Sequence, residues 1–323
     1  MKALDYIPPG FAPAEPWPAN PRVEVRSARS NDVLVPVGTD KVHHWALNPY
    51  SGCQFACVWC RGRQEVPFRD ADPRLFERDI HVRANALEAV TRALKQGAFL
   101  RAPLVLGTLC DPWQPAEERV QVTRSVLDLL ARFGSVDLRA QTRSTLAPRD
   151  ADLLAAIDRR GRATVSFSIA TLQAKLTRLL EPLAPSPDRR LVAMETLARA
   201  GVRVGVQVAP VLSGLNDASQ ELEALLRRAR DAGASFASAA PLSMSAAARS
   251  RIVRFVAGFD PERATRYDRL LARSVEADPR FAPRLAASFA ATCDKLGLAH
   301  SRDRKERAPE DQAGDGPRQL SLF

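Results

Sequence analysis

The sequence has little of several features that mark particular classes of protein. Its five cysteines in 323 residues are too few and too unevenly spaced for a disulfide-stapled domain. No run of about 18 uninterrupted apolar residues occurs, so we expect no membrane-spanning helix. The Pro-rich stretch 1–18 lacks the apolar core of a secretory signal. These absences indicate a protein of the reducing cytoplasm.

The charge is strongly one-sided. Lysine and arginine number 47 against 37 aspartates and glutamates, a net charge of +10, and only six of the basic residues are lysines. An excess of this kind suits a polyanionic partner, because phosphate neutralisation releases counterions. An arginine-rich composition inherited from biased coding explains it equally well. The charge therefore suggests nucleic acid without deciding the matter.

From about residue 42 onward, short apolar runs alternate with helical patterns. We expect strands at 103–107, 135–141, 163–169, 202–209 and 235–240. We expect helices near 83–96, 117–132, 149–158, 186–200 and 217–231. This alternation predicts a parallel sheet, either closed into a full or partial barrel or left open and doubly wound. In each case ligands gather at the carboxyl ends of the strands.

The same patterns divide the chain into four parts. Residues 1–40 carry seven prolines and are expected to be an irregular lead-in, followed by an α/β core over 41–242. Residues 243–300 are helical in pattern and are expected to cover the core. The polar stretch 301–323 is expected to be a disordered tail.

Three of the five cysteines crowd into one loop. Cys53, Cys57 and Cys60 have C-x3-C-x2-C spacing. A structural zinc site normally takes four ligands in two pairs, and no second pair exists. A two-cluster ferredoxin motif would need a further cysteine at position 64, where this chain has glutamine. A thioredoxin-like pair would use only Cys57 and Cys60 and would leave Cys53 without a role. Three thiolates suit a [4Fe-4S] cluster with one iron left open to a small molecule.

This spacing, with the aromatic Trp59 before the last cysteine, resembles the radical S-adenosylmethionine (SAM) superfamily. The resemblance implies that Cys53, Cys57 and Cys60 bind a [4Fe-4S] cluster whose free iron holds SAM. Reductive cleavage of SAM then yields a 5′-deoxyadenosyl radical. The implied fold is α/β: a partial (β/α)6 TIM-like barrel with C-terminal helices.

Further motifs over about 45–240 narrow the resemblance to the spore photoproduct lyase-related, DNA repair photolyase-like family. They lie at 48–50, 107–115, 141–144, 168–171, 180–187 and 209–217. The resemblance implies cofactor-binding roles for Trp59, Thr108, Asp111, Arg143, Ser144 and Ser168. An arginine at a strand end suits bidentate carboxylate binding, although a solvated surface arginine is the simpler alternative. The sequence departs from the family at Arg143, where a lysine is usual, and at 61–63, which read Arg-Gly-Arg instead of Tyr-Ala-Arg.

Cys110 is a further candidate because it follows a predicted strand and precedes Asp111. In spore photoproduct lyase a cysteine of this strand region returns a hydrogen atom to the product radical. Alignment on the aspartate places that cysteine at Thr108. Cys110 is therefore a candidate catalytic residue, with a small apolar filler as the alternative. Cys293, on the apolar face of a late helix, is expected in the core.

The last five residues form a second, independent motif. Three apolar side chains on a polar tail suggest a docking peptide. The pentapeptide matches the binding motif of the bacterial sliding clamp and comprises Gln319, Leu320, Ser321, Leu322 and Phe323. A terminal segment folded back on the domain is the alternative.

Together these features predict a radical SAM enzyme that repairs or modifies DNA, tethered to the sliding clamp and nucleoid-associated in the cytoplasm. An electron donor such as flavodoxin or ferredoxin is implied. One alternative keeps the radical chemistry but modifies RNA, a peptide or a small molecule. The other is a non-catalytic iron–sulfur adaptor for DNA or the clamp, with Cys110 as a fourth ligand.

Overall fold

The computed structural model describes residues 23–39, 42–64, 75–100, 102–242, 249–258, 261–273 and 280–300. Its central element is a seven-stranded sheet in the order β10-β9-β8-β7-β6-β3-β2. The strands are β2 (Leu34–Thr39), β3 (Val42–Leu47), β6 (Leu104–Leu106), β7 (Asp137–Thr142), β8 (Arg162–Ser168), β9 (Arg203–Val211) and β10 (Phe236–Pro241). All neighbours pair in parallel except β2, which pairs antiparallel with β3. Over the described residues the sheet stays open between β10 and β2, so the predicted partial (β/α)6 fold is confirmed and no barrel closes.

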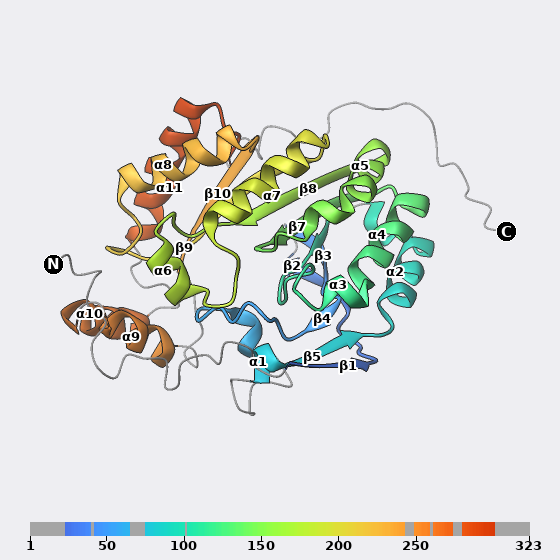
Figure 1. The fold of residues 1–323 in the computed structure, drawn as a ribbon, viewed down its shortest axis with the longest axis horizontal. Helices are drawn as coiled ribbons and strands as arrows, with labels where there is room; N and C mark the ends of the chain where they lie inside the picture. The colour runs from blue at the N-terminus through green and yellow to red at the C-terminus, as the bar shows by residue number, and fades with distance from the viewer. Residues whose placement is uncertain are drawn as a thin grey trace.

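Helices follow the parallel strands and lie around the outside of the curved sheet (Figure 1). They are α2 (Ala86–Lys95), α3 (Glu117–Val120), α4 (Val122–Phe133), α5 (Ala151–Arg160), α7 (Pro187–Arg199) and α8 (Ser219–Asp231). Apart from the short α3, these helices pack their apolar faces with the strand side chains in one core, as the helical spacing predicted. α7 begins close to the predicted residue 186, and the Ser186 hydroxyl accepts a hydrogen bond from the Arg189 backbone N–H.

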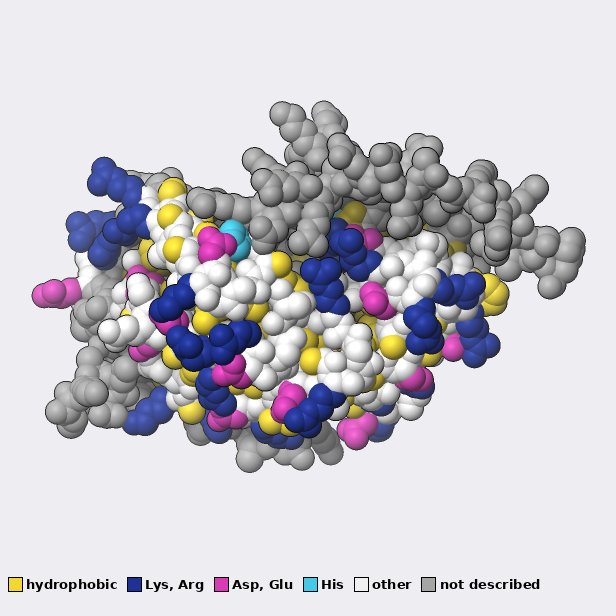
Figure 2. Space-filling view, turned by 90° about the horizontal axis from the view of Figure 1, so that it is seen from above, with side chains coloured by type: hydrophobic (Ala, Val, Ile, Leu, Met, Phe, Trp, Pro, Cys, Tyr) yellow, Lys and Arg dark blue, Asp and Glu magenta, His cyan; other side chains and the backbone are white. Residues whose placement is uncertain are grey.

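The charged side chains of these covering helices are mixed in sign. Figure 2 views the molecule from the side of α8 and α11 (Phe281–Leu296) and shows Lys and Arg side chains interspersed with Asp and Glu. Ion pairs such as Arg227–Glu223 and Lys295–Glu223 account for part of this mixture.

The expectation of an irregular lead-in over 1–40 is wrong where the structure describes it. Residues Glu24–Ala28 form β1, and β2 follows it. Pro36 is tolerated in β2 because that strand lies at the sheet edge, where a missing N–H breaks no inner ladder. β1 joins β5 (Asp79–Arg83) and β4 (Tyr50–Ser51) in a separate three-stranded sheet beside the cysteine loop.

Other short elements complete the chain, and the sequence patterns did not predict them. They are α1 (Leu75–Arg78), α6 (Ala174–Leu180) and the 3-10 turns η2 (Arg61–Gln64), η3 (Ala98–Leu100) and η4 (Ala147–Asp150).

The stretch 243–300, expected to be helical, contains α9 (Arg249–Ala257), α10 (Pro261–Arg273) and α11. α11 packs in the main core and buries Cys293 completely, as predicted. Within the described part of the chain, no helix combines the length and apolar character needed to cross a bilayer. The expected tail 301–323 lies outside the described residues.

Candidate active site at the carboxyl edge of the sheet

The cysteine loop follows β3 and β4. Its backbone takes a conformation that the small residues Gly52 and Ala56 permit. Gly52 has a φ of +86°, and a Cβ there would approach the carbonyl oxygens of Phe76 and Asp79 to 2.9 Å. Ala56 also takes a positive φ, of +57°, which is uncommon outside glycine. The Cys53 N–H donates to the Phe76 carbonyl at 2.8 Å. The loop is therefore held in one defined shape against α1.

Two glutamines bind this loop to the segment after β6. The Gln114 side-chain oxygen accepts from the Gln54 N–H at 3.0 Å, and its amide donates to the Gly52 carbonyl at 3.2 Å. In return, the Gln54 side chain accepts from the Ala116 N–H at 2.6 Å. Gln114 is fully buried. This reciprocal pair fixes the cysteines relative to the sheet.

All three loop cysteines are free thiols within or beside one apolar cluster. Cys53 and Cys57 are buried there with Tyr50, and Cys60 packs at its margin. Burial raises the pKa of the Cys57 thiol to about 12 and that of Cys53 well above its ordinary value. Within the described residues no three Cys, His, Asp or Glu side chains form a single-ion site.

Beside the thiols, Arg143 contacts three other predicted site residues. It follows the last residue of β7 and donates to the Ser168 hydroxyl at 2.8 Å. Its guanidinium carbon lies 4.6 Å from the ring centroid of Trp59, a cation–π distance. Its backbone N–H donates to Asp111 Oδ2 at 2.6 Å. The structure thus brings Trp59, Asp111, Arg143 and Ser168 together, and their contact with a cofactor stays a prediction.

The sequence reasoning did not assign site roles to Glu181 and Arg190, which complete this cluster. Glu181 is buried between two guanidinium groups, with Arg143 Nε 2.8 Å from Oε1 and Arg190 Nη1 2.5 Å from Oε2. Burial acts to raise the pKa of Glu181, but the charges of Arg190 and Arg143 hold it below its ordinary value. The only sequence signal was that Glu181 lies within one of the family-like motifs.

This cluster keeps hydrogen-bond donors that have no partner. Arg190 is fully buried and donates to the carbonyls of Pro185 and Ser168, both at 2.8 Å, but its Nη2 has no hydrogen-bond partner. The Trp59 indole N–H is likewise buried and without a partner. Two guanidinium groups, of Arg143 and Arg190, lie here with two carboxylates, of Glu181 and Asp111. The orphan donors beside the thiols fit a small molecule that carries a carboxylate.

Asp111 and its neighbours hold loops together. The Asp111 carboxylate accepts from the Trp113 N–H at 3.0 Å, from the Thr142 hydroxyl at 2.8 Å and from Arg143. Burial raises the pKa of Asp111. Its oxygens are therefore committed to the chain, joining the loop after β6 to the end of β7. A direct contact of Asp111 with a cofactor remains only a prediction.

Thr108 and Ser144 also bond within the chain. The Thr108 hydroxyl accepts from the Asn48 amide at 2.9 Å, and Asn48 Oδ1 accepts from the Leu109 N–H at 2.8 Å. Ser144 Oγ accepts from the Leu146 N–H at 3.0 Å and closes a local turn. Asn48 is buried and joins β3 to the loop after β6, a positioning role that the sequence did not reveal.

Cys110 is buried in the same apolar cluster as Cys53 and Cys57. Its sulfur lies 3.8 Å from Asn48 Oδ1, and burial raises its pKa to about 12. This position suits a hydrogen-atom donor, a fourth ligand or an apolar filler, so all three hypotheses for Cys110 stay open.

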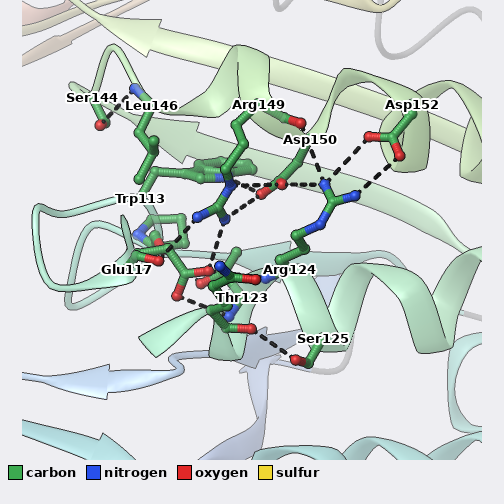
Figure 3. Close-up of polar contacts among 12 residues, drawn as sticks. Trp113, Glu117, Thr123, Arg124, Ser125, Ser144, Leu146, Arg149, Asp150 and Asp152 are labelled. Atoms are coloured by element: carbon green, nitrogen blue, oxygen red, sulfur yellow. Dashed lines mark hydrogen bonds and ion pairs between the residues drawn. The ribbon is translucent and has the colours of Figure 1, made fainter. Parts of the chain in front are cut away.

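A second polar network joins Trp113, Glu117, Arg124, Arg149 and Asp150 (Figure 3). The Trp113 indole donates to Asp150 at 2.8 Å, and Asp150 also accepts from Arg124 and Arg149. Glu117 accepts from Arg149 at 2.9 Å and from the Tyr50 hydroxyl. The network therefore anchors Tyr50, just before the cysteine loop, and Trp113, in the segment after β6.

Comparison with known proteins identifies the family of this chain. The profile of the Radical SAM superfamily matches residues 47–229, more than half of the chain. An uncharacterized protein of Mycobacterium tuberculosis is 30% identical over 280 residues, which cover 86% of this chain and 82% of that protein. An uncharacterized protein of Methanocaldococcus jannaschii is 22% identical over 202 residues, covering 61% and 71% of the two chains.

Among solved structures, spore photoproduct lyase bound to a dinucleoside spore photoproduct is similar with a TM-score of 0.61 and 16% identity. A lyase variant with bound AdoMet and the same dinucleoside gives a TM-score of 0.60 at 15% identity. Each comparison covers 85% of this chain and 81% of the lyase, and identity this low shows the fold alone. Radical SAM proteins use an iron–sulfur cluster and SAM, and the profile match shows that this chain belongs to the radical SAM superfamily.

Proposed function

We propose that Cys53, Cys57 and Cys60 hold a [4Fe-4S] cluster and that the chain uses SAM to repair or modify DNA. The observation that carries this proposal is the position of the three thiols beside the orphan donors of Trp59 and Arg190. When bound, the reduced cluster and SAM supply a 5′-deoxyadenosyl radical that abstracts a hydrogen atom from the substrate.

The chain's own residues hold and orient the cofactor. Arg143 and the unpartnered Nη2 of Arg190 offer charged donors to the carboxylate of SAM. Glu181 pairs with both guanidinium groups and so fixes their positions. Ser168 and Trp59 flank Arg143 and would lie against the nucleoside part.

Exclusion of water is the second contribution of the chain. Tyr50, Phe55 and Phe76 are buried around the thiols, and the Gln54–Gln114 pair keeps the loop closed over them. A dry site protects a reactive radical from side reactions with solvent.

DNA is the proposed substrate on three grounds. The net charge of +10 favours a polyanion. The lyase of similar fold carries a dinucleoside photoproduct in its solved structures. The pentapeptide 319–323, outside the described residues, matches the clamp-binding motif.

We also propose a flavodoxin- or ferredoxin-type electron donor and a position at the nucleoid. The core 41–242, helical cover 243–300 and tail 301–323 remain the proposed division of the chain.

Isotope transfer tests the substrate class. The reduced, cluster-loaded protein is incubated with SAM and either fully deuterated DNA or fully deuterated RNA. The 5′-deoxyadenosine is then analysed by mass spectrometry. Deuterium transferred from DNA, and not from RNA, supports the proposal, and the Cys57→Ala variant controls for cofactor cleavage. Deuterium from RNA alone, or abundant 5′-deoxyadenosine without deuterium from either polymer, favours the alternative of an RNA, peptide or small-molecule substrate.

A second candidate function follows from Cys110, which is buried in the same cluster as Cys53 and Cys57. If Cys110 is a fourth ligand, the cluster has no open iron, and the protein is an iron–sulfur adaptor. Cys110→Ala would then lose cluster iron, and added SAM would leave the electron paramagnetic resonance spectrum of the wild type unchanged. Iron retention in Cys110→Ala with a SAM-sensitive spectrum contradicts the adaptor.

The clamp proposal has its own test. Purified sliding clamp is titrated with the full chain and with a chain that ends at residue 318. Binding by the full chain alone supports the tether. Equal binding by both chains, or none by either, contradicts it.

A further inference from the structure

Three helices gather at the carboxyl edge of the sheet, next to the cysteine loop. We call α6, α9 and α10 the mouth helices. The inner faces of α9 and α10 bury Ile252, Phe255 and Tyr267 in one apolar cluster with α6 and with residues just after β8, β9 and β10. Val58 and Trp59 of the cysteine loop pack against the same cluster. The Tyr267 hydroxyl donates to the Ser213 carbonyl, after β9, at 2.8 Å. The mouth helices therefore border the proposed active site.

Their charge differs sharply from that of the covering helices. The 29 residues of the mouth helices contain nine basic residues and two acidic ones, a net charge of +7. The 74 residues of α2, α4, α5, α7, α8 and α11 contain 14 basic and 10 acidic residues, a net charge of +4. The mixed charges of the α8 and α11 side are visible in Figure 2. Basic residues therefore outnumber acidic ones by seven in the sequences of the mouth helices, which border the proposed active site.

The exposed side chains of the mouth helices favour phosphate contacts over base stacking. Lys175, Arg178, Arg254, Arg266 and Arg269 are exposed. The large apolar side chains that are exposed in the described part of the chain lie on other elements. Cationic side chains without aromatic platforms bind the sugar–phosphate backbone and carry little sequence information.

We propose that the mouth helices form the DNA-binding surface. Their basic side chains bind the phosphate backbone and so position a nucleotide at the site beside Trp59. The inference rests on the proposed function, because it assumes that DNA is the substrate. A base inside a duplex is shielded, so the bound strand is either single or has the target nucleotide turned out. Binding is expected to depend strongly on salt and weakly on sequence.

Two triple variants with identical charge test this surface. One is Arg254→Gln/Arg266→Gln/Arg269→Gln in the mouth helices. The control is Arg159→Gln/Arg162→Gln/Arg199→Gln, three exposed arginines at the opposite end of the parallel strands. Each variant lowers the net charge from +10 to +7. Any difference between them reports the position of the charge and not its amount.

The measurement is fluorescence anisotropy of labelled single-stranded and duplex DNA, titrated with the cluster-loaded full chain over a range of salt. For the mouth variant we expect the slope of log K against log salt to fall by about 2 on single strands and about 3 on duplex. We expect its Kd to rise at least roughly tenfold, while the control stays within about twofold of wild type. Circular dichroism checks that both variants fold.

Three results would overturn the proposal. Equal weakening in both variants would show that bulk charge alone binds DNA. Unchanged DNA binding in the mouth variant, with lost reduction by flavodoxin, would assign the surface to the electron donor. Wild-type binding to RNA but not DNA would reject the DNA surface. The isotope-transfer experiment reports the reaction separately, so a failed surface and a failed function give different results.

Discussion

Two aspartates on either side of Arg124 provide a direct test of how the polar network supports the site. Asp150 is fully buried and accepts from Trp113 Nε1, Arg124 Nη1 and two nitrogens of Arg149, at 2.7–2.9 Å. Asp152 is 60% exposed, and its carboxylate contacts the Arg124 guanidinium at 3.2 and 3.4 Å. The perturbation is Asp150→Asn, with Asp152→Asn as the matched control.

The expected magnitudes follow from burial. Asparagine at 150 keeps one accepting oxygen and turns an amide toward cationic donors, so at least two of four hydrogen bonds are lost. Charge-assisted hydrogen bonds contribute about 1.5–3 kcal/mol each, and breaking a buried ion pair costs about 3–5 kcal/mol. Arg149 is 23% exposed, so water compensates in part, and we expect a loss of about 3 kcal/mol. The exposed pair of Asp152 is expected to contribute about 0.5 kcal/mol.

The free energy of unfolding of both variants is measured by urea unfolding of the full chain, monitored by tryptophan fluorescence and circular dichroism. Trp113 contacts Asp150 directly, so its emission reports the local change. Equal midpoints for the two variants, or a loss below about 1 kcal/mol in Asp150→Asn, would refute the reasoning that burial makes this network stabilising.

Three further predictions concern the site itself. Cys57→Ala is expected to reduce reconstituted iron from about four per chain to below one, whereas Cys293→Ala, in the core of α11, retains it; equal loss would contradict the ligand assignment. Gln114→Leu removes the acceptor of the Gln54 N–H, so we expect a loss of about 1–3 kcal/mol and faster iron release to a chelator; unchanged release would contradict its positioning role. Glu181 has a folded-state pKa below its ordinary 4.5, so its stabilisation is complete above pH 4.5 and is lost as pH falls through the folded value. The gap in unfolding free energy between wild type and Glu181→Gln should therefore shrink from about pH 7 to about pH 4, and a constant or growing gap would contradict the ion pairs.

The parallel core was predictable because its strands carry a strong local signal. β9 is rich in valine, and β8 alternates buried apolar residues with less buried ones. Both strands are flanked by amphipathic helices, so the strand periodicity and the order of the elements could be predicted. β3, with the sequence VHHWAL, was missed because two histidines and a tryptophan obscure the apolar run. β2 was missed because Pro36 argues against a strand unless that strand is known to lie at an edge.

The site was predictable where motifs carry it and not where tertiary packing does. The cysteine spacing identified Cys53, Cys57 and Cys60, and the family resemblance indicated Arg143 and Ser168, which the structure brings into contact. Arg190 lies on a helix and, in the sequence, resembles any solvated arginine. Its complete burial against Glu181 depends on how α7 packs on β8, which no local pattern encodes. Gln114 and Asn48 bridge segments about 60 residues apart, so their roles also emerge only from the fold.

The central claim is that three thiols hold a cluster that cleaves SAM, and one anaerobic assay tests it most directly. The full chain is reconstituted with iron and sulfide, reduced and given SAM, and 5′-deoxyadenosine is measured beside Cys57→Ala. We predict 5′-deoxyadenosine from the wild type and none from Cys57→Ala. A fully loaded cluster that yields no 5′-deoxyadenosine, even with DNA present, would contradict the claim.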